Sequence, residues 1–346
     1  MLFLLRVLGV IRGNAFPGGL ASFAVKLFLT ASLPRLSFAA MPRYSLALVT
    51  ALVALAAGCA RLPTGVTQIK AATPADLRQQ ILDGKPDVDQ FRVRGPFEVD
   101  LRKDRGLDLP GRRVEADWYL AALPGKRPLV VLLHGDENSK EDHSYQGLHL
   151  ATWGIHAVAV GLPNRGPWVD NGRTLAGIVS AIRRRPELLE GRVDPDRIIL
   201  AGHSFGGAAV VVAMAEGAPV AGGILLDPAS LGKAFHGHLK RVDKPVLLLG
   251  ADEWYSPVKD RPDFFFYIPR GIAEISVTDS YHDDAEFRLE PADDPAATAT
   301  EDMQITFVSA LTATALSLAY TGNLDYAWKS FAGGLESGKF SKAMRK

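Results

Sequence analysis

The sequence predicts an α/β fold with a mostly parallel central sheet, an antiparallel N-terminal hairpin and helices on both faces. The first observation is a series of short, continuously apolar runs, which are typical of parallel strands covered on both faces. The second is that helical segments separate these runs, as in β–α–β units. The third is that two alternating segments precede them, which is the pattern of half-exposed strands.

The expected elements follow the chain in a regular order. The hairpin strands are residues 97–101 and 114–120, and a turn region rich in Gly, Pro and Asp separates them. The buried strands are expected at residues 128–133, 155–160, 197–201, 222–226, 245–249 and, with a weaker pattern, 273–277. The main helices are expected at residues 175–185, 206–216 and 302–320.

The composition is that of a globular chain with a sizeable core. Hydrophobic residues make up 47% and charged residues 22% of the 346 residues. Lys and Arg number 39 against 38 Asp and Glu, so the formal net charge is +1. Such a balance creates no general field that attracts a polyanion, and we expect no nucleic-acid partner.

The N-terminal region has the pattern of a secretory signal. Met41 opens a short basic start, an apolar run covers residues 46–57, and small residues lead to Cys59. The run is too short for a transmembrane helix. Residues 56–59 resemble a bacterial lipobox, which implies lipidation of Cys59 and anchoring in the outer membrane, facing the periplasm. A plain cleaved signal, giving a periplasmic or secreted protein, stays open, and residues 1–40 are interpreted as an over-called start.

A serine motif stands between a strand and a helix. Residues 202–206 read Gly-His-Ser-Phe-Gly, directly after the strand 197–201 and at the start of the helix 206–216. This strand–turn–helix setting is that of the nucleophile elbow in α/β-hydrolases, where flanking glycines allow a close backbone approach. Ser204 is therefore the candidate nucleophile. A phosphate-binding loop is disfavoured because no Lys-Ser/Thr pair follows the glycines.

Two backbone N–H groups form the oxyanion hole in this fold. One belongs to the residue after the nucleophile, which is Phe205. The other belongs to the turn after an earlier strand, where His134 and Gly135 end the apolar run, and we expect the amide of Asp136 to serve.

The base and the acid are expected downstream of the serine, in the order acid and then His. His282 follows the last predicted strand on a polar loop, and it is the candidate base. Three carboxylates stand at strand ends: Asp227 after one strand, and Asp252 and Glu253 after the next. The residues alone leave the choice among them open.

Three segments resemble the plasma-type platelet-activating-factor acetylhydrolase group: residues 202–208, 225–228, and 280–282 with Phe287. The similarity extends over roughly residues 128–320. Bacterial polyester hydrolases and relatives of dienelactone hydrolase carry similar elbows.

The resemblance also implies the acid. The acetylhydrolase group implies Asp227, whereas the polyester hydrolases imply Asp252 or Glu253. The chain departs from the acetylhydrolases just after Asp227, because residues 228–230 read Pro-Ala-Ser where an aromatic residue is usual.

These observations predict a serine hydrolase that cleaves carboxylic esters, either lipid-derived or short-chain, and thus a role in lipid degradation. The mechanism needs no metal and no organic cofactor. A peptidase or thioesterase with the same triad is an alternative, and so is a non-catalytic envelope lipoprotein that uses the fold as a binding scaffold. A set of aromatic residues either lines an acyl site or packs in the core: Trp168, Trp254, Tyr255 and the run 264–267.

The predicted organisation has three parts. Residues 1–58 form a signal region, residues 59–90 form a tether or N-terminal arm with a short helix at 76–82, and residues 91–340 form a single α/β-hydrolase catalytic domain.

Overall fold

The computed structural model describes residues 74–83, 87–253, 256–290 and 300–346. They belong to one compact unit. The predicted signal segment and Cys59 lie outside the described residues.

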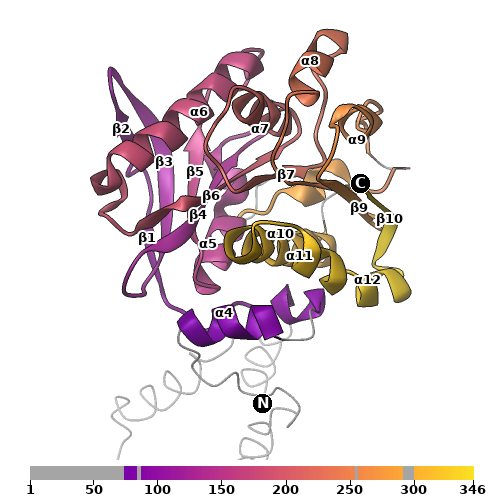
Figure 1. Cartoon of the computed structure of the whole chain (residues 1–346), viewed down its shortest axis with the longest axis horizontal. Helices are drawn as coiled ribbons and strands as arrows, with labels where there is room; N and C mark the ends of the chain where they lie inside the picture. Colours follow the sequence, from indigo (N-terminus) through magenta and orange to yellow (C-terminus); the bar gives the residue numbers. More distant parts are fainter. Residues whose placement is uncertain (1–73, 84–86, 254–255, 291–299) are drawn as a thin grey trace, which may run out of the picture. The chain divides into compact units, whose positions relative to one another are not determined.

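A sheet of ten strands forms the centre of this unit (Figure 1). The strand order is β1-β3-β5-β4-β6-β7-β8-β9-β10, and β2 pairs with β3. The six strands from β5 to β9 are parallel to one another, whereas β1, β2 and β3 on one side and β10 on the other pair antiparallel. The strands are β1 (Val99–Arg102), β2 (Leu107–Leu109), β3 (Arg112–Ala121), β4 (Arg127–Leu133), β5 (His156–Gly161), β6 (Val193–His203), β7 (Gly222–Leu226), β8 (Val246–Gly250), β9 (Ile272–Val277) and β10 (Phe340–Arg345).

Helices cover both faces of the sheet, and each face has its own hydrophobic core. Leu150, Phe307 and Leu311 pack on one face, and Ile178 and Val211 on the other. Figure 1 shows α6 and α7 on one side of the sheet and α10 and α11 on the opposite side. The α-helices are α4 (Pro74–Asp83), α5 (Ser144–Thr152), α6 (Trp168–Arg184), α7 (Phe205–Ala215), α8 (His236–Leu239), α9 (Pro262–Tyr267), α10 (Glu301–Thr321), α11 (Asp325–Ser330) and α12 (Ala332–Glu336). The 3₁₀ helices are η3 (Val88–Arg92), η4 (Lys140–His143), η5 (Pro186–Leu189), η6 (Lys233–Phe235) and η7 (His282–Ala285).

Double coverage explains why the parallel strands are visible in the sequence. All residues of β7, β8 and β9 are buried, so both faces of each strand require side chains that pack without water. Glu274 in β9 differs from the apolar residues around it, because it is fully buried although its side chain is ionisable. The predicted fold class is confirmed by this sheet.

Several elements differ from the expectations. β2 and β10 were not expected, because β2 has three residues and β10 is a partly exposed edge strand with charged side chains. α6 begins earlier than the helix expected at residues 175–185, so that Trp168 is its first residue and is 3% exposed. Residues 59–90 are expected to be a tether or N-terminal arm; in their described part Val88 is buried, and the Gln90 amide donates to the Tyr326 hydroxyl of α11.

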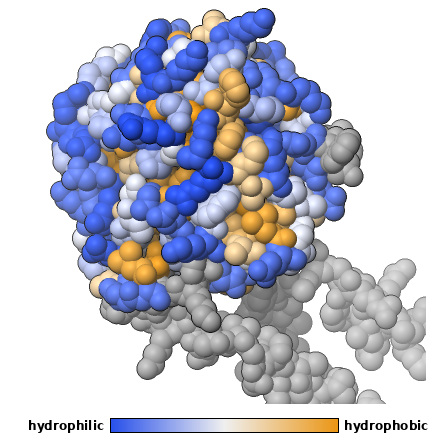
Figure 2. All heavy atoms as spheres, turned by 45° about the vertical axis from the view of Figure 1, so that its right-hand side comes forward, coloured by the Kyte–Doolittle hydropathy of each residue, from blue (hydrophilic) through white to orange (hydrophobic). Residues whose placement is uncertain are grey.

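The surface is predominantly hydrophilic on the face that Figure 2 shows, with apolar side chains gathered in smaller patches between the polar ones. Among the described residues, α10 is long and apolar enough to cross a membrane by length and composition. However, 78% of its most apolar stretch is buried inside the fold, which is the behaviour of a core helix. Within the part of the chain that the structure describes, the exposed large apolar side chains are Leu82, Val93, Leu101, Phe266 and Met344.

Candidate active site

Ser204 lies at the sharp turn between β6 and α7. Its backbone has φ 52° and ψ −125°, a region that residues other than glycine rarely adopt. Such a conformation costs about 1–3 kcal/mol and persists only where the surroundings enforce it. Here the Ser204 N–H donates to the Leu226 carbonyl, and its own carbonyl accepts from the Ala229 N–H, each over 3.0 Å. The turn is therefore held by the end of β7.

Two glycines let the turn after β4 approach the serine. A Cβ on Gly206 would lie 2.4 Å from the His134 carbonyl oxygen, and a Cβ on Gly135 would lie 2.9 Å from the Ser204 Cβ. Both distances are shorter than side chains tolerate, so glycine is required for this packing. The contact brings the two predicted sources of oxyanion donors to the same place.

The oxyanion candidates lie on either side of this contact. Phe205 is the first residue of α7, so its N–H has no carbonyl partner within the helix. Asp136 has an exposed side chain. The neighbouring Glu137 is also exposed, and its carboxylate pairs with Arg165 over 2.9 Å. The Glu137 charge, which would oppose an oxyanion, is thus paired with a cation.

His282 is paired with Asp227. The His282 Nδ1–H donates to Asp227 Oδ2 over 2.6 Å. This bond fixes the tautomer, because it leaves Nε2 as the nitrogen that can accept a proton. His203, which precedes Ser204, donates from Nε2 to the His282 carbonyl oxygen over 3.1 Å, and the two rings lie 4.3 Å apart. The pair therefore lies beside the serine turn.

Asp227 is fully buried and has four partners. Besides His282, the Ala251 N–H donates to Oδ1 over 3.0 Å, the Ser256 hydroxyl to Oδ2 over 2.7 Å, and Arg261 Nη1 to Oδ1 over 2.5 Å. Burial alone would raise the pKa of Asp227, but the hydrogen bond from His282 and the charge of Arg261 hold this pKa well below its usual range. Asp227 is therefore ionised at neutral pH.

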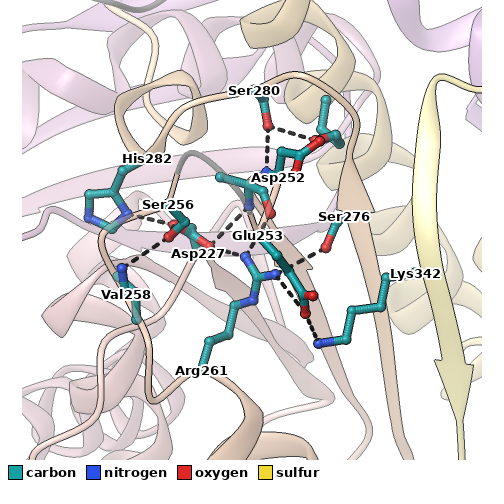
Figure 3. A network of polar contacts seen from close by, with 12 residues as sticks. Asp227, Asp252, Glu253, Ser256, Val258, Arg261, Ser276, Ser280, His282 and Lys342 are labelled. Atoms are coloured by element: carbon teal, nitrogen blue, oxygen red, sulfur yellow. Dashed lines mark hydrogen bonds and ion pairs between the residues drawn. The ribbon is translucent and has the colours of Figure 1, made fainter.

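The other two candidate acids point elsewhere. Asp252 accepts from the Asp279 N–H over 2.9 Å, and Glu253 pairs with Lys342 of β10. Figure 3 shows His282 and Ser256 converging on Asp227, whereas Asp252 lies toward Ser280. Asp227 is thus the carboxylate that accepts the hydrogen bond from His282 seen in Figure 3.

The Alpha/beta hydrolase family model matches residues 130–331, which contain Ser204, Asp227 and His282. The chain belongs to the alpha/beta hydrolase family. No curated protein matches it. Family membership supports hydrolase activity, and the sheet order described above agrees with the family fold.

This alpha/beta hydrolase carries a buried arginine behind its candidate acid. Arg261 is 2% exposed, and besides Asp227 it donates to the Ala251 carbonyl and the Ser276 hydroxyl. Its Nε lies 3.7 Å from the buried Glu274, which also pairs with Lys342 over 2.8 Å. Figure 3 shows a parallel link, in which Glu253 lies between Arg261 and Lys342 of β10. No sequence pattern indicated Arg261, since it precedes a short helix and pairs with residues distant in the chain.

The aromatic residues named above have different environments in the hydrolase. Trp168 stacks on Phe205 with ring centroids 5.7 Å apart, so it packs beside the nucleophile turn. In α9, Phe264 is buried in the core, whereas Phe266 is 73% exposed. Trp254 and Tyr255 lie outside the described residues.

A cavity of about 480 Å³ opens beside the turn after β4. It lies where β4 and β5 end and β3 begins, and its lining is mixed polar and apolar. The lining includes His134, Asn138, Lys140, Leu162, Asn164 and Arg112. Within the described ranges, no group of three or more His, Cys, Asp or Glu side chains is arranged to hold a metal ion.

Proposed function

We propose that this protein is a serine hydrolase that cleaves carboxylic esters through Ser204, His282 and Asp227. The observation that carries the proposal is the 2.6 Å pair of His282 and Asp227 beside a serine held at φ 52° between a strand and a helix. A strained serine next to a histidine oriented by a buried carboxylate is the arrangement that nucleophilic acyl transfer requires.

The proposed reaction has two steps. His282 Nε2 takes the hydroxyl proton as Ser204 Oγ attacks the ester carbonyl carbon, and the N–H groups of Phe205 and Asp136 bind the oxyanion. His282 then gives the proton to the alcohol oxygen as its bond to the carbonyl carbon breaks. The alcohol departs, and the acyl group stays bound to Ser204 Oγ. Water, deprotonated by His282, attacks the acyl-enzyme, and the carboxylic acid departs as Oγ regains its proton. Asp227 stabilises the imidazolium in both steps.

We propose lipid-derived or short-chain acyl esters as substrates. The resemblance to the acetylhydrolase and polyester hydrolase groups supports this class. The half-buried Phe205, which stacks on the buried Trp168, supplies apolar surface at the nucleophile turn.

Fluorophosphonate labelling tests the proposal, combined with hydrolysis of p-nitrophenyl acetate to octanoate. We expect the wild type to be labelled and active, and Ser204→Ala to lose both properties because the nucleophilic oxygen is gone. Ser230→Ala is the matched control, since Ser230 is also 7% exposed but its hydroxyl accepts from the Gly232 N–H. Labelling that persists in Ser204→Ala, or a wild type that is neither labelled nor active, would refute the proposal.

We further propose a lipid anchor on Cys59 that places the enzyme in the cell envelope. The support is the lipobox-like segment ahead of this cysteine. Expressed from Met41, the wild type is expected to partition with membranes, and Cys59→Ala is expected to appear in the soluble periplasmic fraction. Fractionation with immunodetection measures this. Equal membrane partitioning of both proteins would contradict lipidation.

A further inference from the structure

A second histidine is buried directly behind the proposed base. His203 is 1% exposed, and an oxygen atom lies close to each of its ring nitrogens. Nε2–H donates to the His282 carbonyl over 3.1 Å, whereas Nδ1 lies 2.9 Å from Glu286 Oε1 in an ion-pair contact without hydrogen-bond geometry. Both oxygens are acceptors only, because a main-chain carbonyl and an ionised carboxylate carry no proton. Neutral imidazole has a single N–H, so the doubly protonated cation fits both neighbours.

The charges of the pair support this protonation. Burial would lower the pKa of His203, but the Glu286 carboxylate outweighs it and leaves this pKa raised. Asp227 and Asp283 act in the same direction. Burial would raise the pKa of Glu286, but His203 outweighs it and lowers this pKa to about 2. An ion pair buried to this degree is stable only when each charge has its partner.

The neighbours Asn138 and His143 do not bring a positive charge to Glu286, so His203 is the cation that balances its carboxylate. The second carboxylate oxygen accepts from the Asn138 amide over 2.6 Å. His143 Nε2 lies 3.9 Å away, but its Nδ1–H donates to Gln146 Oε1, and burial lowers the pKa of His143. His143 is therefore neutral at pH 7, and it does not compensate the Glu286 charge.

We propose that His203 and Glu286 are positioning residues, which form a buried charged pair that holds the backbone of His282 and keeps a positive charge beside its imidazole. The proposal rests on the proposed function of His282 as the base. The bond to the His282 carbonyl fixes the residue at the start of η7, and the ring of His203 lies 4.3 Å from that of His282. The two contacts therefore fix the position of the base and place a positive charge beside its imidazole.

Nuclear magnetic resonance of protein labelled with ¹⁵N-histidine tests the charged pair without any assay of activity. We expect His203 to give two ring N–H signals at about pH 6 in the wild type, because its pKa is raised above the ordinary histidine value of about 6.5. His203→Gln should remove both signals, which assigns them. Glu286→Gln should leave one, because the cation loses its counter-charge. A single ring N–H signal for His203 in the wild type would overturn the proposal.

The pH dependence of kcat/KM tests the effect on His282. In His203→Gln and in Glu286→Gln, the pH of half-maximal activity on the acidic side should rise by about one unit, because the neighbouring cation is lost. The double variant should shift no further than either single variant, since the pair acts as one unit. Asp263→Asn is the matched control: it breaks a 2.8 Å histidine–carboxylate contact with His236 and should leave the profile unchanged.

Two results would overturn the positioning role. One is a wild-type pH profile in both single variants with only a lower Tm, which would mean that the pair is merely structural. The other is a shift to lower pH in Glu286→Gln, which would mean that His203 keeps its charge without Glu286. Absence of Ser204-dependent turnover in the wild type would refute the proposed function instead, and the ring signals would then decide the charged pair by themselves.

Discussion

Asp227→Asn is expected to lower kcat by about four orders of magnitude with little change in KM. Asparagine presents an N–H₂ group to His282 Nδ1, which favours the tautomer with its proton on Nε2, and the negative charge that stabilises the imidazolium disappears. The substitution is compatible with the backbone, because Asp227 has φ 37° and asparagine tolerates positive φ better than most residues. Steady-state kinetics on p-nitrophenyl esters measure the loss.

Asp252→Asn and Glu253→Gln serve as the matched controls for this prediction. Both change a carboxylate just after β8 to the corresponding amide, and both should keep kcat close to the wild-type value, since Asp252 accepts from the Asp279 N–H and Glu253 pairs with Lys342. Near-normal activity of Asp227→Asn, together with a large loss in either control, would assign the acid to the end of β8.

Arg261→Leu is expected to lower the free energy of unfolding by about 3–5 kcal/mol at pH 7, because it leaves buried charge without its partner. Asp227 would lose the Arg261 bond of 2.5 Å, and Glu274 would keep Lys342 alone as its cation. Urea denaturation followed by circular dichroism gives the value. Arg345→Met is the matched control, since it breaks a 2.5 Å pair with Asp325 on the surface, where such pairs contribute about 0–1 kcal/mol.

The effect of Arg261→Leu should depend on pH in a defined direction. The folded-state pKa of Asp227 is depressed, so the stability that this group contributes is present above its unfolded pKa of about 3.9 and is lost as the pH falls below it. The difference between wild type and Arg261→Leu should therefore be larger at pH 7 than at about pH 3. A difference that is constant with pH, or below 1 kcal/mol at pH 7, would contradict the ion-pair explanation.

The parallel part of the sheet could be predicted because the burial of each strand produces a recognisable pattern over a few consecutive residues. β4 and β8 are covered on both faces, so each gives an unbroken apolar run, and the helices between them carry the longer period. β10 could not be predicted in this way. It is an edge strand that pairs with β9 alone. One of its charged residues, Lys342, reaches inward to Glu274, and the charge at its end faces solvent.

The same distinction between local patterns and distant contacts applies to the candidate site. The surroundings of Ser204 are local, since strand, turn and helix follow one another within about twenty residues, and the sequence therefore indicated the candidate nucleophile. The choice among the carboxylates depends on which of them bonds to His282, 55 residues beyond Asp227. The contact between His203 and Glu286 left no signal either, because the two residues lie 83 positions apart in the chain. Contacts between distant residues leave no periodic pattern.

The register of two strands has a consequence for how this chain can vary in length. His203 of β6 pairs with Leu226 of β7, so Ser204 and Asp227 are each the first residue beyond the last paired position. Their separation is set by hydrogen bonds across the sheet and not by the number of residues between them. Insertions at residues 216–220, at the far end of α7, would leave the proposed nucleophile and acid in place, whereas one residue added inside either strand would turn one of these two side chains to the opposite face.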